Sequence, residues 1–301
     1  QKIKIKKISC ISARSPYMLD HSGKILRIVR ESKKMSRAMI ADKEISQSQI
    51  SRFENGETTL TINKFLLLLQ NMSVTLDEFQ SIADNYNMSE EFSFREELKT
   101  AYDERNIKLL SEMITFWEEK SIKNPQKMHL KINAIVVKTV LSHILIKFRI
   151  GRNEVEYIKE YLLNVEEWGR YEFWVLGNTV SIFKDSELKM LGRAAVEKDK
   201  FYQNIMLNKR IAIRTFLNFT AIWLERNDLS QALRYINYLE AMTINVDFLY
   251  EKVMMNYNKG WYYYKAGHES GKIKMHESAD FLEKYGFSGL AKNLREEIKN
   301  L

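Results

Sequence analysis

Apolar side chains recur at helical spacing along almost the whole chain, beginning near residue 22. Residues 22–86 divide into five short amphipathic segments that are separated by polar residues. A residue that favours the N-cap of a helix precedes three of these segments, namely Ser22, Ser36 and Ser46. The pattern therefore predicts a five-helix unit with helices over Gly23–Lys34, Arg37–Lys43, 47–55, Ile62–Asn71 and Leu76–Tyr86.

The same spacing predicts which side chains form the core of this unit. In the first helix we expect Ile25, Ile28 and Val29 to point inward. In the third helix Ile50 and Phe53 share an inner face at positions i and i+3. Gly56 follows the third helix, where a residue that adopts positive φ readily is expected to end it.

From Glu90 onward the chain repeats an amphipathic helix, a short polar break and a second amphipathic helix. The spacing of the breaks is 47, 32, 43 and 40 residues, which is typical of degenerate tetratricopeptide-like helical pairs. Residues 287–301 are expected to cover the open end as a capping helix. The breaks before the second helices fall near Asn106, Asn153, Asp185, Asp228 and His268.

Composition agrees with a chain that is helical almost throughout. The sequence holds 11 glycines and 2 prolines in 301 residues, too few for a turn-rich sandwich or barrel. Its 45% hydrophobic and 29% charged residues exclude wholesale disorder. The predicted fold class is all-α, with a five-helix repressor-type domain followed by a right-handed solenoid of helical pairs.

We expect four segments along the chain. Residues 1–17 are a basic N-terminal extension or an expression remnant, since Met18 is a possible start. Residues 18–86 form the first domain, residues 90–286 the repeat domain, and residues 287–301 the capping helix.

The chemistry-bearing residues exclude several classes of protein. Cys10 is the one cysteine, which excludes an intramolecular disulfide framework and a cysteine-built metal site, and favours the cytoplasm. No apolar run is long enough to span a membrane. The histidines lack metal-ligand spacing, and His143 is expected in the core. No P-loop, metalloprotease or dinucleotide motif occurs, so we expect no enzyme, catalytic residue, metal or cofactor.

Charge is concentrated at the N-terminal end. Residues 1–58 carry 13 Lys and Arg against 6 Asp and Glu, a net charge of +7, whereas the whole chain carries +8. A basic head on a nearly neutral body indicates binding to a polyanion such as nucleic acid. The alternative is ordinary solvated lysine, because four of these charges lie in the first seven residues.

The pattern M-S-x(3)-I-A-x(4)-S-x-S-Q-I-S-R-F-E-N-G, from Met35 to Gly56, resembles the helix-turn-helix of phage-repressor (XRE-type) proteins. The turn KEIS is one residue shorter than the usual form and lacks its glycine. The resemblance implies that the second helix of the motif enters the major groove of double-stranded operator DNA. Gln47, Ser48 and Arg52 would then reach base edges, while Ser46 and Asn55 would contact phosphate; the alternative is a solvated helix face.

The first helices of a solenoid line a concave face, where mixed polar and aromatic stripes indicate a binding surface. Asparagine amides suit an extended peptide backbone, and arginine suits a carboxylate. The alternative is that the aromatic side chains belong to the core and that the asparagines only tie neighbouring helices together. The candidate peptide-binding residues are Arg149, Arg152, Trp174, Asn178, Arg214, Asn218, Asn256 and Trp261.

Nearly all of residues 18–301 is similar to the Rgg group of quorum-sensing regulators, most specifically in SQSQISRFENGE, SVTLDEF and YEFWVLGN. This resemblance implies a homodimeric cytoplasmic transcription factor whose repeat domain binds a short peptide pheromone. The alternative is a repeat domain that docks a protein partner instead. Leu290 and Leu294 of the last helix are candidate dimer contacts, unless they fold back on their own chain.

Overall fold

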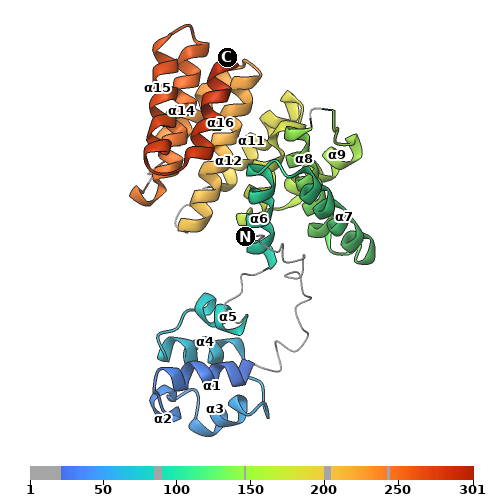
Figure 1. The fold of residues 1–301 in the computed structure, drawn as a ribbon. Coiled ribbons are helices and arrows are strands. Elements are labelled where there is room, and N and C mark those ends of the chain that lie inside the picture. The colour runs from blue at the N-terminus through green and yellow to red at the C-terminus, as the bar shows by residue number, and fades with distance from the viewer. Residues whose placement is uncertain (1–21, 85–89, 146, 200–204, 243–244) are drawn as a thin grey trace, which may run out of the picture. The chain divides into compact units, whose positions relative to one another are not determined.

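The computed structural model describes residues 22–84, 90–145, 147–199, 205–242 and 245–301, and all regular secondary structure in these ranges is helical (Figure 1). This confirms the all-α prediction. The predicted extension, residues 1–17, and the predicted helix end at Tyr86 lie outside the described residues. The chain divides into two units, Gln1–Glu97 and Leu98–Leu301, which we call the head and the repeat unit.

Within residues 22–84 of the head, which the structure describes, five helices lie close to the predicted positions. They are α1 (Ser22–Ser32), α2 (Arg37–Ile40), α3 (Gln47–Glu54), α4 (Ile62–Asn71) and α5 (Leu76–Ala83). Their shared core is Leu26, Val29, Ile40, Ile45, Ile50, Phe53, Leu68, Leu69, Met72, Val74 and Phe79.

Local capping explains where two of these helices begin. The Ser36 hydroxyl accepts a hydrogen bond from the Met39 amide, 3.3 Å away, at the start of α2. At the start of α3, Ser46 and Gln49 form a reciprocal capping box. The predicted caps Ser36 and Ser46 are therefore confirmed, and so is Gly56, which follows α3 with φ +77°.

The inner face of α1 differs from the prediction. Ile28 is exposed, and Leu26 takes its expected place in the core. The reason is the close crossing of α1 over the end of α3, where a Cβ on Gly23 would lie 1.8 Å from the carbonyl oxygen of Phe53. This contact turns Gly23, Leu26 and Val29 inward and leaves Ile28 in solvent.

The prediction that α2 continues to Lys43 was wrong. The helix ends at Ile40, and the Asp42 carboxylate accepts hydrogen bonds from the amides of Glu44 (2.8 Å) and Ile45 (3.1 Å). An aspartate that binds nearby amides in this way competes with the helix. The turn of the motif therefore spans residues 41–46 and is longer than KEIS.

The predicted pairing of helices after residue 90 is also present. The helices are α6 (Glu90–Asp103), α7 (Ile107–Lys123), α8 (Met128–Ile144), α9 (Arg152–Asn164), α10 (Arg170–Thr179), α11 (Asp185–Asp199), α12 (Met206–Glu225), α13 (Leu229–Ala241), α14 (Leu249–Lys265), α15 (Ser270–Lys284) and α16 (Ser288–Lys299). Single-turn 3₁₀ helices, Val180–Ile182 and Val246–Phe248, follow α10 and precede α14.

Two of the predicted breaks are side-chain caps. Asn106 accepts from the Leu109 amide at 3.0 Å and begins α7, and Asp228 accepts from the Gln231 amide at 3.1 Å and begins α13. Asp185 begins α11, whereas Asn153 lies one residue inside α9.

The first helices α8, α10, α12 and α14 pack in succession against one another, and the second helices α9 and α11 form a neighbouring row. Side chains on these two rows therefore belong to different surfaces.

Candidate DNA-binding helix and ligand-binding face

The outer face of α3 carries all five predicted DNA contacts. Each of these side chains is exposed: Ser46, Gln47, Ser48, Arg52 and Asn55. Ser48, Arg52 and Asn55 share one face at i, i+4 and i+7, opposite the core residues Ile50 and Phe53.

These five side chains differ in how much hydrogen-bonding capacity is left for a ligand. The Ser46 hydroxyl lies 2.9 Å from that of Ser48, and the Asn55 amide donates to Glu57 at 3.1 Å. Gln47 and Arg52 have no side-chain hydrogen bond or ion pair to another residue in the described part of the chain. Gln47 and Arg52 are thus the side chains best placed to bind base edges, with adenine and guanine as their usual partners.

A buried ion cluster, which the sequence reasoning missed, fixes α3 from behind. The Glu54 carboxylate accepts hydrogen bonds from Arg30 of α1 at 2.6 and 3.0 Å and from Arg37 of α2 at 2.8 Å. Arg30 also donates to the carbonyl oxygen of Met35 at 2.7 Å. The available signal was the position of Glu54 four residues after Ile50, which places a charge on an inward face.

In the repeat unit, polar side chains bridge successive first helices. Tyr171 of α10 donates to Asn133 of α8 at 3.0 Å, and Asn218 of α12 donates to the Gly177 carbonyl of α10 at 2.9 Å. Asn258 of α14 donates to the Leu217 carbonyl at 3.0 Å. Asn218 therefore ties two helices together, as the alternative to a peptide contact predicted. Its side chain is also exposed, whereas that of Asn258 is buried.

Three of the predicted ligand contacts lie together on α10 and α12. Trp174 is half-buried beside Tyr171, with ring centroids 6.0 Å apart. The half-buried Asn178 donates to the Trp174 carbonyl at 2.8 Å. Asn218 reaches Gly177, the residue before Asn178, so the two amides are neighbours on adjacent helices.

Two further candidates on the first helices are exposed. Arg214 of α12 is half exposed and donates to the buried Glu251 of α14 at 2.7 Å, so its charge is partly compensated. Asn256 of α14 is exposed. Because both side chains are exposed on first helices, Arg214 and Asn256 remain candidate peptide contacts.

The structure places Arg152 and Trp261 away from the predicted roles. Arg152 begins α9, a second helix, and its guanidinium binds Glu187 of α11 at 2.5 and 3.3 Å and also Glu156. Trp261 is buried in α14. Neither is presented on the face of the first helices, because Arg152 ties two second helices and Trp261 fills the core. Arg149 is exposed in the connection between α8 and α9.

The burial of two further side chains, His143 and Leu294, differs from what their predicted roles require. His143 is exposed, not in the core, and its Nε2 lies 2.8 Å from the Ser181 hydroxyl. Leu294 of α16, a predicted dimer contact, is buried against its own chain. Leu290 is half-buried.

No group of histidine, cysteine, aspartate and glutamate in the part of the chain that the structure describes has the arrangement of a metal site. Among the same residues, no helix is long and apolar enough to cross a membrane.

A capped helix-turn-helix with an exposed recognition helix, joined in one chain to paired helical repeats, defines a DNA-binding regulator with a separate repeat unit. Two family models identify the family of this regulator. The family model "Helix-turn-helix" matches residues 26–79, and "HTH-type transcriptional regulator Rgg, C-terminal domain" matches residues 97–296. The chain therefore belongs to the Rgg family of transcriptional regulators, as the sequence resemblance predicted.

Solved structures agree with this assignment. The SHP pheromone receptor Rgg2 of Streptococcus dysgalactiae is 26% identical, with TM-score 0.75 over 92% of this chain and 99% of that one. A transcriptional regulator from Listeria monocytogenes EGD-e is 17% identical, with TM-score 0.79 over 94% and 97%. The PrgX/cCF10 complex matches at 14% identity and TM-score 0.70 over 93% and 99%. The last two matches bear on the fold alone.

Proposed function

We propose that this protein is a cytoplasmic regulator that binds operator DNA as a homodimer and is controlled by a short linear peptide bound on its first helices. The observation that carries the DNA-binding part is the outer face of α3. There Gln47 and Arg52 are exposed, without a side-chain partner among the described residues, on a helix that the buried Glu54 holds in place. Two such heads, about one helical turn apart, would read a two-fold operator.

The proposed division of labour follows the two units. Residues 18–86 would bind DNA, residues 90–286 would bind the peptide and join the two copies, and residues 287–301 would cap the repeats. Ser46 and Asn55 would contact phosphate, and Gln47, Ser48 and Arg52 would contact base edges. We assign no catalytic step, metal or cofactor to this protein.

The proposed peptide site consists of the exposed and half-buried polar groups on α10, α12 and α14. Asn178 and Asn218 would pair with the peptide backbone, Trp174 would supply apolar contact, and Arg214 and Asn256 would lie at the edge. Support for a peptide comes from Rgg2, which is described as a pheromone receptor. Arg149 is a further candidate for an anionic group of the peptide.

Replacing Arg52 with alanine tests the assignment of α3 to the groove. We expect Arg52→Ala to lose about 1–3 kcal/mol of specific affinity and to relax preference at one base pair, because a bidentate contact would be removed. The measurement is fluorescence anisotropy at fixed salt on an operator first located by footprinting.

Arg27→Ala is the matched control, since it removes one positive charge from α1 where Arg27 already pairs with Glu31. If Arg52→Ala kept wild-type affinity and base preference, α3 would not be the reading helix.

Replacing Asn218 tests the peptide site. A buried peptide amide left without its partner costs about 1–3 kcal/mol, so Asn218→Ala should weaken peptide binding by roughly tenfold or more. The peptide is first identified by mass spectrometry of ligand co-purified from the native host, then synthesised and titrated by calorimetry.

Asn258→Ala is the control, because Asn258 makes the same kind of tie from a buried position. We expect it to lower the melting temperature without changing the affinity of the folded protein for the peptide. Normal binding by both Asn178→Ala and Asn218→Ala would show that these amides only tie helices. Co-purification of a protein instead of a peptide would favour a protein partner.

A further inference from the structure

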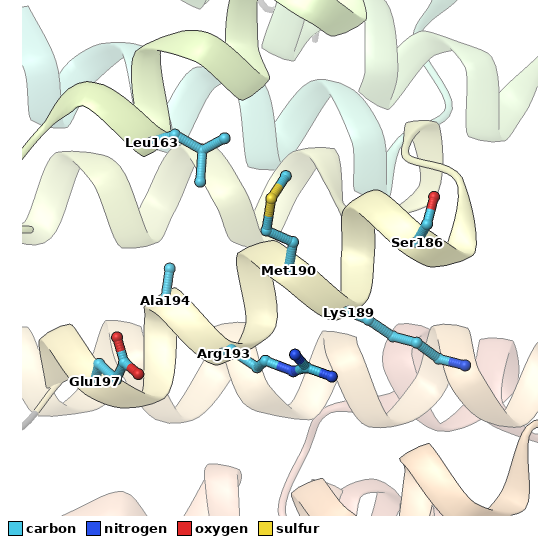
Figure 2. Close-up of a pocket in the computed structure, with 7 residues that line it drawn as sticks. All are labelled: Leu163, Ser186, Lys189, Met190, Arg193, Ala194 and Glu197. Carbon is cyan, nitrogen blue, oxygen red and sulfur yellow. The ribbon is translucent and has the colours of Figure 1, made fainter.

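The outer side of α11 is a surface that the proposed DNA and peptide sites do not use. It belongs to the row of second helices, and it lines a cavity of about 460 Å³ together with Leu163 of α9 (Figure 2). The α11 side chains in this lining are Ser186, Lys189, Met190, Arg193, Ala194 and Glu197.

Apolar side chains in this lining remain open to solvent within the single chain. Met190 is 41% exposed and Leu163 is 38% exposed. In Figure 2 Leu163 and Met190 extend toward each other from α9 and α11. Ala194, one turn after Met190, leaves room for the backbone of another helix to approach closely, since its side chain is a single methyl group.

The charges on this face are ordered along the helix. Lys189 and Arg193 lie ahead of Glu197 in the chain, so the face is positive first and negative toward its end. Lys189 is paired with Asp228 at 3.2 Å. Arg193 and Glu197 stand at i and i+4, but neither forms an ion pair or hydrogen bond with any residue that the structure describes.

This order of charge is self-complementary when two copies of the helix meet antiparallel. A two-fold axis near the middle of the face would set Arg193 of each copy against the partner's Glu197, so one contact would form two ion pairs. A parallel arrangement would instead set like charges side by side.

We propose that the outer side of α11 is the two-fold contact between two copies of this chain, with Ala194 beside the crossing and Arg193 and Glu197 paired across it. The proposal rests on the homodimer of the proposed function. It also moves the expected dimer contact from Leu294, which its own chain covers, to α11.

The test uses the full chain and charge reversal on each side of the expected pair. Arg193→Glu makes both charges of the pair negative, and Glu197→Arg makes both positive. We expect each variant alone to dimerise more weakly by about tenfold or more in sedimentation equilibrium, because like charges face each other twice. An equimolar mixture of the two variants should form heterodimers close to wild-type strength, because both pairs are then opposite in sign.

Arg234→Glu on α13 is the matched control, since Arg234 is exposed and the change in charge is the same. Wild-type dimerisation by the single variants, or a mixture as weak as its components, would overturn the α11 contact. Each variant is also titrated with operator half-site DNA and with peptide, which are expected to bind normally.

The outcomes separate this inference from the proposed function. A dimeric wild type whose variants stay dimeric would overturn the α11 contact and leave the homodimer intact. A wild type that is monomeric at all concentrations tested would overturn both the contact and the homodimer.

Discussion

Removing the carboxylate of Glu54 is expected to lower the free energy of unfolding of the head by about 3–5 kcal/mol, because two guanidinium groups lose their shared buried partner. The Glu54 side chain is 0% exposed and binds both Arg30 and Arg37. In Glu54→Ala the buried guanidinium of Arg30 would keep only its longer contact with the exposed Glu31, 3.3 Å away, as an acidic partner. We expect Glu54→Gln to be milder, since the amide still accepts one hydrogen bond.

The measurement is hydrogen exchange by mass spectrometry on the full chain, with peptides from α1, α2 and α3 followed separately. Glu57→Gln is the control, because Glu57 is an exposed acid close to the same helix. Operator affinity should fall with the protection of α3, because the orientation of this helix depends on the Glu54 cluster. Wild-type protection in Glu54→Ala would show that packing alone holds α3.

The ion cluster between α9 and α11 should make the stability of the repeat unit depend on pH. Hydrogen bonding from Arg152, and then from the Lys184 amide and Lys159, lowers the pKa of Glu187 to about 2, against an ordinary value of 4.5. Because the pKa is lower in the folded state, the stabilisation is complete above about pH 4.5 and is lost as pH falls toward 2. We expect it to contribute about 2–3 kcal/mol at neutral pH, allowing for the half-exposed Arg152, and roughly half of that at pH 3.

Glu187→Gln isolates this contribution. The variant should be less stable than the wild type at pH 7, and the difference between the two unfolding free energies should fall to roughly half at pH 3 and continue to close as the pH approaches 2. Urea unfolding followed by tryptophan fluorescence reports only on the repeat unit, since all five tryptophans lie there: Trp117, Trp168, Trp174, Trp223 and Trp261. A difference between the two proteins that is constant with pH would contradict the assignment.

Helix positions and outward faces could be predicted because their causes are local. Ser46 caps α3 through residues at most three positions away, and Asn106 and Asp228 begin α7 and α13 in the same way. The 3.6-residue period then decides that Arg52 points away from Ile50 and Phe53. The end of α2 was placed three residues too late although its cause is also local, because the Asp42 carboxylate binds the amides of Glu44 and Ile45 in place of a further helical turn.

The sequence by itself thus determined the class of the protein, the order of its helices and the exposed face of α3, since each depends on residues within one or two helical turns. Only the tertiary structure decided which charged and polar side chains meet across the chain. Arg30 and Glu54 are 24 residues apart, and Arg152 and Glu187 are 35 apart. Such pairs depend on how whole helices pack, which the period of a single helix does not encode. For the same reason Asn258 became a buried tie while Asn218 stayed exposed.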